Sequence, residues 1–454
     1  MAKSLSKGFK WTIGIIGSAV GLLLFLLLIG FIVDLCTYPA LKRTGNKALK
    51  SLMAYNRNEP GNAWNYYSAA IEKSKNIPSA SVLYKYLDGS TEITQEMLQS
   101  FKDYENAIIE LKEGARQKYC SIPYDYSKGV AVKIPNFMAL RKIGEITCAR
   151  GLYELENDNT KLAIDDVLTV ADVGKHIANS APNLLNQMIG IVFLNYAVKV
   201  LKIGLSSDLF NRDELEKISK KLSGIEKDFP LLSAGLDGGK KQLEISFGNR
   251  SAFKSMRSLA GLFFYENKMP SVFEHIVFRL FCWRYLFSPR LAAFRGFKFM
   301  DYIVSRMREL ETSYEQINKK EQNDLQIQER LSKNAKNYAA KNPVFSTMFP
   351  NFFSMYDRKV EAITKIRILQ LSCSIRFYYS ENRRFPEGLQ EIGGDIITDL
   401  NTGDMWSYTN YDDSCEIYSP GPNPKNTQDD ISITLTKMGI KEYLENRRKG
   451  IRSR

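Results

Sequence analysis

An uncharged apolar run near the start constrains this chain more than any other feature. Trp11 to Val33 contains 23 residues without one charged side chain. As a helix with a rise of 1.5 Å per residue it covers about 34 Å, enough for a bilayer core of about 30 Å. A cleaved signal peptide has a shorter apolar region that ends in small residues. This run ends in Asp34-Leu35-Cys36, which fits neither that cleavage nor lipoprotein processing at Cys36. We predict a transmembrane helix over 11–33, after a short basic tail over 1–10.

The charges of the chain indicate how the predicted helix is oriented in the membrane and which partners the protein contacts. Asp34 follows the run directly, so the nearest basic residues lie on the N-terminal side. Those basic residues are Lys3, Lys7 and Lys10 before the run and Lys42, Arg43, Lys47 and Lys50 after it. We expect a cytoplasmic N-terminus and an extracytoplasmic body. The net charge of +13 suits anionic lipid, cell-wall polymer or nucleic acid. Because the anchor already holds the chain at a membrane, we expect membrane contact and protein partners in the envelope, and no nucleic acid.

The residues over 46–307 have the pattern of an α-helical array. Three successive helices are predicted at Arg141–Leu155, Lys161–His176 and Leu184–Ile203, with polar breaks between them. Gly151, Ala163 and Val167 have the spacing of a close helix crossing and resemble a tetratricopeptide pair, although any antiparallel helix pair needs small residues there. The fold class is therefore mainly α, with a helical array that is possibly tetratricopeptide-like.

Two apolar stretches of the body are interrupted by polar residues. Asn183–Leu205 contains Lys199 and Lys202, and Val272–Phe287 contains Arg279 and Arg284. Both are expected as buried or interfacial helices, and neither as a second span. Ser271–Tyr302 mixes aromatic residues with arginines, which fits a core helix with surface arginines or a helix lying on anionic lipid.

The stretch after the first three helices predicts further helices and connections. Asp208 is a candidate helix cap before Leu209–Leu222, and a connection is expected over Phe229-Pro230 and Gly235–Gly239. Residues 308–356 are polar and are expected to form a helix or linker.

The sharpest pattern lies over 357–435. Apolar residues recur every three or four positions from Val360 to Phe377, which predicts a helix that ends near Asn382, before Pro386. Trp406–Thr409 and Glu416–Tyr418 are strand candidates. We predict a small α+β module, followed by a basic tail over 436–454.

This module resembles the globular head of type II secretion pseudopilins. The matching elements are Asn382-Arg-Arg-Phe-Pro386, Asp399-Leu-Asn-Thr-Gly403 with Tyr408, Ile417-Tyr-Ser-Pro-Gly-Pro-Asn423, and the pair Asp429-Asp430. It is closer to the tail of a group of uncharacterised membrane-anchored helical proteins of planctomycete-type bacteria. That resemblance implies a single-pass protein of the bacterial inner (cytoplasmic) membrane. About 320 residues separate the apolar run from the head, and residues 1–11 lack a prepilin cleavage motif, so assembly into a pseudopilus is not expected.

Pseudopilin heads often bind calcium in their closing loop, and this resemblance implies Asp429 and Asp430 as metal ligands. Asn423 stands where pseudopilins usually carry Asp, which removes a charge from the loop. An acidic, solvated turn is the alternative reading. No other cofactor is expected.

No catalytic constellation emerges from the remaining residues. His176 and His275 have no metal or nucleophile partner at helical spacing, and no phosphate-binding or nucleophile-elbow motif is present. Six cysteines without a CxxC pair are expected as buried thiols, with one or two disulfides as the alternative. We therefore predict a membrane-tethered extracytoplasmic scaffold or interaction protein. The alternatives are an accessory component of a secretion or pilus-like machine and an enzyme acting on envelope polymers.

Overall fold

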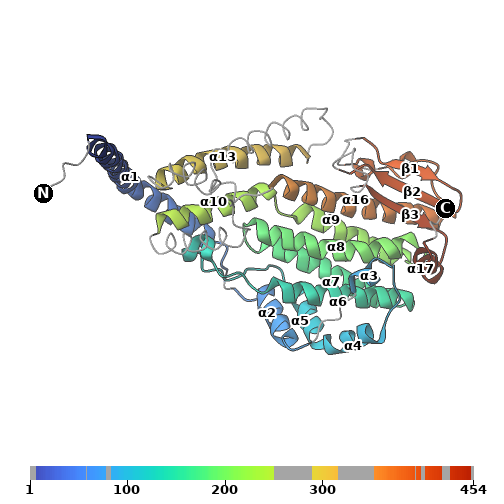
Figure 1. Cartoon of the computed structure of the whole chain (residues 1–454). Coiled ribbons are helices and arrows are strands. Elements are labelled where there is room, and N and C mark those ends of the chain that lie inside the picture. Colours follow the sequence, from blue (N-terminus) through green and yellow to red (C-terminus); the bar gives the residue numbers. More distant parts are fainter. Residues whose placement is uncertain are drawn as a thin grey trace.

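The computed structural model describes residues 7–57, 59–77, 83–249, 289–314, 352–393, 395–399, 404–421 and 430–450. Within helix α1 its side chains are described at a few positions between Phe25 and Val33 and throughout from Leu35 onward. The described chain is mainly α-helical, with one three-stranded antiparallel sheet near its C-terminal end. The mainly α fold class predicted from the sequence is confirmed at that level (Figure 1).

Helix α1 (Lys7–Met53) joins the first part of the chain to the body. Its last turns are buried through Leu41, Ala48 and Leu52, while its beginning extends away from the other labelled elements (Figure 1). It packs on helix α10 (Leu232–Gly248), where a Cβ added to Gly45 would come within 2.8 Å of the Glu244 carbonyl oxygen. The two helix backbones therefore nearly touch at this crossing.

The body is built from antiparallel helices in close contact. Its first elements are α2 (Ala63–Ser74), α3 (Leu83–Leu87), α4 (Gln95–Asp103), α5 (Glu105–Ala115) and the 3₁₀ turn η1 (Tyr126–Ala131). They are followed by α6 (Phe137–Glu156), α7 (Thr160–Asn179) and α8 (Leu184–Ser206), which confirm the three successive helices predicted from the sequence. The expected small-residue crossing is present, since a Cβ on Gly151 would lie 2.8 Å from Val167.

Helix α8 is apolar and long enough to span a membrane, with a mean hydropathy of 1.7 over an 18-residue window. Two thirds of that window are buried inside the protein, against α7, α6 and α16. In this structure α8 is a core helix, which is the buried one of the two alternatives expected for Asn183–Leu205. Among the residues whose side chains the structure describes, α8 is the one helix that is long and apolar enough to span a membrane. Most side chains of Trp11–Val33 lie outside the described set, so the N-terminal span stays a prediction.

Two details of the following segment differ from the sequence-based expectations. Helix α9 (Arg212–Asp228) is capped by Asn211 and not by Asp208, because Asn211 and Glu214 exchange side-chain hydrogen bonds with each other's backbone N–H. Pro230 does separate α9 from α10, but Gly235–Gly239 lies inside α10. Gly238 is needed within that helix, because a Cβ there would overlap the carbonyl oxygen of Pro182.

Helices α13 (Pro289–Tyr314) and α16 (Phe352–Asn382) complete the described helical layer. The part of α13 up to Tyr302 belongs to the aromatic segment Ser271–Tyr302 noted in the sequence. The residues of that segment before α13 lie outside the described chain. Helix α16 packs along α9 and α8 and ends at Asn382, as predicted.

The sheet follows α16 after the 3₁₀ turns η3 (Leu389–Glu391) and η4 (Asp395–Ile397). Strands β1 (Ser407–Asn410), β2 (Ser414–Ser419) and β3 (Ile431–Thr436) are antiparallel in that order. The first two confirm the predicted hairpin, and β3 was not singled out from the sequence. Helix α17 (Ile440–Arg448) closes the module against α6 and α8, within the stretch that the sequence suggested as a basic tail.

Arg376 joins the helical body to the sheet. Its guanidinium is buried and donates hydrogen bonds to the carbonyl oxygens of Leu205 and Ser206, at the end of α8, and of Thr436 in β3, all at 2.8–3.0 Å. Carbonyl groups in the last turn of a helix have no partner within the helix, so Arg376 both caps α8 and holds the sheet against it.

Candidate functional site

His176 is part of the core. The ring is 7% exposed, and its Nδ1 lies 2.8 Å from the Tyr67 hydroxyl oxygen, which connects α7 to α2. Burial, together with nearby Lys175 and Lys221, lowers the pKa of His176 to about 4. A neutral, buried imidazole that is hydrogen-bonded to a tyrosine has a structural role. His275 lies outside the described residues.

The adjacent pair Asp165-Asp166 belongs to a network of ion pairs. Asp166 is fully buried and receives two hydrogen bonds from Arg150, at 2.7 and 2.9 Å, and one ion pair from Lys112 at 2.6 Å. Asp165 is half-buried and pairs with the same lysine at 2.7 Å. The network ties α5, α6 and α7 together, which gives these carboxylates a structural role.

Of the two expected calcium ligands, Asp429 lies outside the described residues and Asp430 immediately precedes β3. Asp430 interacts with the Tyr418 hydroxyl and lines a cavity that also contains lysine and arginine side chains. In the described part of the chain, no three His, Cys, Asp or Glu side chains gather as a metal site would require. The calcium site therefore stays a prediction based on the resemblance.

The cysteines in the described chain are free thiols. Cys120, Cys148, Cys373 and Cys415 are buried, and burial raises the pKa of each thiol, so they are unreactive at neutral pH. Cys36 on α1 is exposed. Cys282 is not among the described residues.

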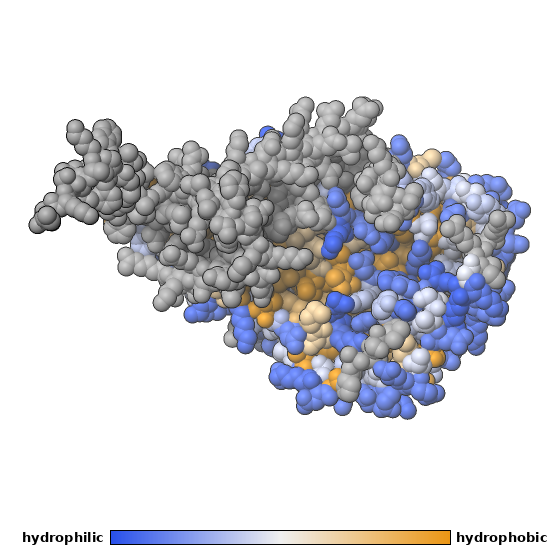
Figure 2. All heavy atoms as spheres, in the orientation of Figure 1, coloured by the Kyte–Doolittle hydropathy of each residue, from blue (hydrophilic) through white to orange (hydrophobic). Residues whose placement is uncertain are grey.

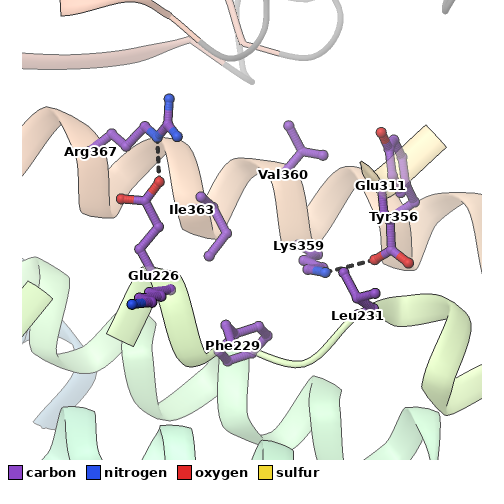
Figure 3. A pocket seen from close by; sticks show the side chains of 10 residues that line it. Glu226, Phe229, Leu231, Glu311, Tyr356, Lys359, Val360, Ile363 and Arg367 are labelled. Atoms are coloured by element: carbon purple, nitrogen blue, oxygen red, sulfur yellow. Dashed lines mark hydrogen bonds and ion pairs between the residues drawn. The ribbon is translucent and has the colours of Figure 1, made fainter. Parts of the chain in front are cut away.

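A groove of about 340 Å³ lies where α9 leads into α10, facing α13 and α16 (Figure 3). Phe229, Val360 and Ile363 are among its apolar lining residues. The two carboxylates that line the groove already have partners. Glu226 accepts hydrogen bonds from Arg367 at 2.5 Å and from Gln370 at 2.9 Å, and Glu311 pairs with Lys359 at 2.7 Å.

Glu311 also accepts the backbone N–H groups of Leu232 and Ser233 at the first turn of α10. A carboxylate at that position satisfies N–H groups that have no partner inside the helix. The polar groups of the groove thus hold α13, α16 and α10 together, and we assign the groove a structural role.

A second cavity, of about 490 Å³, lies between the helical body and the C-terminal module, and we call it the junction cavity. It is lined by residues of α8, α16, β3, α17 and the end of α3. Apolar residues line much of it, namely Leu87, Val192, Val198, Ile203, Ile368, Leu369 and Ile431. Residues from five elements far apart in the sequence therefore form one enclosure.

The charged side chains of the junction cavity are mainly basic. They are the cations Lys199, Lys202, Lys365 and Arg447 and the carboxylates Asp88 and Asp430. Asp88 pairs with Lys199 at 2.7 Å and accepts a hydrogen bond from Arg447 at its backbone oxygen. Lys365 pairs with Glu361, one turn earlier on α16.

Lys202 has no such partner among the described residues: no acceptor lies within bonding distance of its ammonium group. Burial and the nearby charges of Arg447 and Lys365 lower the pKa of Lys202 to about 8, against a smaller opposing effect of Glu416. The cavity thus combines an excess of cations with one incompletely neutralised lysine.

None of these basic residues was proposed as a site residue from the sequence, although Lys199 and Lys202 were noted as interruptions of an apolar stretch. Two lysines one turn apart on a helix that is otherwise uncharged were the available signal. Lys365 and Arg447 carry no comparable signal, because only the tertiary packing brings them to α8.

No family model matches this chain, and no curated protein or solved structure matches it either. The functional argument therefore depends on the geometry of the described residues.

Proposed function

We propose that this chain is a single-pass, membrane-tethered interaction protein whose helical body lies outside the cytoplasm at the bacterial inner membrane. The membrane contact is made by 11–33, and the body presents its surface to protein partners in the envelope. The C-terminal module is fastened to the body by Arg376, so the two act as one unit at the end of the tether.

The observation that carries the tether is an apolar strip on α1. Where side chains before Cys36 are described, the large apolar ones are exposed, between 42% and 59%. They are Phe25, Leu28, Ile29, Ile32 and Leu35. Their spacing of three or four residues puts most of them on one side of the helix. Leaving so many large apolar side chains in water is unfavourable, and a bilayer removes that cost.

The visible face of the body supports its position outside the bilayer (Figure 2). In Figure 2 hydrophilic residues cover most of the visible face over α2–α5, and apolar residues gather toward the middle of the view, where Figure 1 places α8. Lys42, Arg43, Lys47 and Lys50 are exposed on α1 just after the strip. Cations there fit contact with lipid phosphates at the membrane surface.

Membrane extraction tests the tether. The full chain is expected to float with membrane vesicles and to resist extraction at alkaline pH. The double variant Leu22→Lys and Phe25→Lys should move most of the protein to the soluble fraction, because each lysine near the middle of the span 11–33 costs about 2.5–3.5 kcal/mol.

The matched control is the double variant Ile134→Lys and Met138→Lys, which changes exposed apolar residues of the body. It should leave the membrane fraction unchanged. Release of the unmodified chain by alkaline extraction would contradict the tether. A C-terminal phosphatase fusion reports an extracytoplasmic body by its activity, and a fluorescent cytoplasmic reporter at the same position would contradict that orientation.

A second candidate, an accessory role in a secretion machine, is favoured by the long α16 helix that leads into the three-stranded antiparallel sheet. This arrangement agrees with the pseudopilin-head resemblance of 357–435. Loss of the chain should then reduce secretion of an exported enzyme, with normal levels of that enzyme inside the cell. Unchanged secretion would remove this candidate and leave the tethered interaction protein in place.

A further inference from the structure

We propose that the junction cavity is a binding site for a small organic anion, with a carboxylate or phosphate group at Lys202 and an apolar part against α8 and α16. This inference is independent of the tether, because β3 and α17, which line the cavity, lie far from the beginning of α1 (Figure 1).

The size and lining of the cavity favour a small molecule. A volume of about 490 Å³ is within the range of about 300–1,000 Å³ that ligand pockets occupy. Val192, Ile368 and Leu369 provide an apolar wall, and Asn195, Tyr196 and Ser432 add uncharged polar groups. A mainly apolar enclosure with a few convergent polar groups is the usual form of a ligand site.

The charges favour an anion over a cation or a neutral molecule. Four cations face two carboxylates, and Asp88 is already paired with Lys199. The carboxylate of Asp430 interacts with Tyr418, and the ammonium group of Lys365 pairs with Glu361. Neither Asp430 nor Lys365 is therefore directed wholly at Lys202. An anion at Lys202 would form a charge-assisted hydrogen bond and reduce the repulsion between this lysine, Lys365 and Arg447.

A ligand there would contact both parts of the chain. Lys202 belongs to α8 in the body, whereas Ser432 and Arg447 belong to the C-terminal module. Binding would therefore stabilise their junction, in addition to the hydrogen bonds of Arg376.

Calorimetric titration of the full chain in lipid nanodiscs tests the proposal, with empty nanodiscs subtracted. The probes are hexyl phosphate, hexanoate, inorganic phosphate and hexanol. At least one of the two hexyl anions should bind saturably, one per chain, and at least about tenfold more tightly than hexanol, because only an anion can form a charge-assisted contact with Lys202. The tighter of the two identifies the preferred headgroup.

Three other outcomes of the titration would count against the proposal. Absence of saturable binding by both hexyl anions would overturn it. Inorganic phosphate binding as tightly as hexyl phosphate would overturn the apolar half of the site, and hexanol binding as tightly as both anions would overturn the anionic half.

Variants connect the binding to the named lysine. Lys202→Met should weaken binding of the hexyl anion at least about tenfold, whereas Lys202→Arg should keep most of the affinity because the charge remains. Lys220→Met is the matched control, since it removes an exposed lysine of α9 and should change nothing. Equal affinity of Lys202→Met and the unmodified chain would assign the binding to another place.

Proton uptake gives a readout that needs no variant. With the pKa of Lys202 at about 8, the free protein carries about half a proton there at pH 8. Hexanoate is fully ionised at that pH, and its binding raises the pKa of the lysine, so titrations in buffers of different ionisation enthalpy should show uptake of up to about half a proton. Binding without any uptake would contradict contact with Lys202, even if Lys202→Met failed to fold.

Discussion

At the residue scale, the buried charged and polar groups of this protein are mainly structural. Asp166, His176 and Arg376 are each almost fully buried, and each has hydrogen-bond partners on other elements. A buried charge that keeps its partners is tolerated, whereas the same charge without them is costly. Lys202 is the contrasting case, because it has no partner in the described chain.

Replacing Asp166 with Ala should lower the free energy of unfolding by about 3–5 kcal/mol, because Arg150 and Lys112 would lose their buried counter-charge. Chemical denaturation followed by circular dichroism measures this loss. Asp165→Ala is the control. Its carboxylate is half-exposed, so its ion pair with Lys112 contributes about 1 kcal/mol or less. Equal losses in the two variants would contradict the buried network.

His176 should make stability depend on pH between about 4 and 6.5. The folded-state pKa is depressed to about 4, and the unfolded value is about 6.5, so within this window the unfolded chain binds more protons. The contribution of the neutral ring is therefore complete above about pH 6.5 and is lost as the pH falls toward 4. The whole effect amounts to about 3 kcal/mol.

His176→Gln tests this by removing the titrating group while retaining a polar side chain. Unfolding is measured at several pH values from 4 to 7, and the variant should show a flatter dependence than the unmodified chain. The same slope in both proteins would mean that another group titrates in this range.

At the element scale, glycines decide how closely the helices approach one another. Gly45 and Gly248 allow α1 to cross α10, and Gly151 allows α6 to cross α7. Gly224 on α9, in contrast, has open space where a Cβ would be added. The same residue type therefore has opposite energetic consequences at these positions.

Gly45→Ala should destabilise the protein by about 1–3 kcal/mol, because the new methyl group meets the Glu244 carbonyl oxygen and forces the helices apart. Gly224→Ala, the matched control, should stabilise it by about 0.5–1 kcal/mol through the better helix propensity of Ala. Thermal and chemical denaturation measure both values. A neutral result for Gly45→Ala would show that the α1–α10 contact adapts easily.

The helices of the body were predictable from the sequence because their apolar periodicity is local. The three helices from Phe137 to Ser206 and the end of α16 at Asn382 followed from this pattern. The cap at Asn211 and the continuation of α10 through Gly235–Gly239 did not. A cap depends on which of several polar residues meets the first N–H groups, and a glycine-rich helix is stabilised by a tight contact that the sequence does not display.

At the scale of the whole molecule, α1 has two roles along its length. Its C-terminal turns belong to the core through Leu41, Ala48 and Leu52, whereas the strip before Cys36 is exposed. The C-terminal module is also joined to the body, because Arg376 and Thr436 both donate hydrogen bonds to the end of α8.

Removal of residues 1–35 should yield a body that no longer associates with membranes and unfolds at nearly the same temperature as the full chain. Removal of residues 1–53 should instead destabilise it strongly, because each large buried side chain contributes about 2–5 kcal/mol. Scanning calorimetry and membrane flotation of the two truncated chains distinguish these outcomes. Equal stability of both would contradict the role of Leu41 and Leu52 in the core.

The sequence by itself determined the mainly α character, the uncharged run Trp11–Val33, the order of the body helices and the first hairpin of the sheet. These features depend on neighbours within about a dozen residues, so their periodicity is visible in the chain. Only the tertiary structure decided that Lys202, Lys365 and Arg447 meet in one cavity, and that Arg376 joins α8 to β3. Contacts between positions far apart in the sequence leave no local pattern, because they arise when whole helices and strands pack against one another.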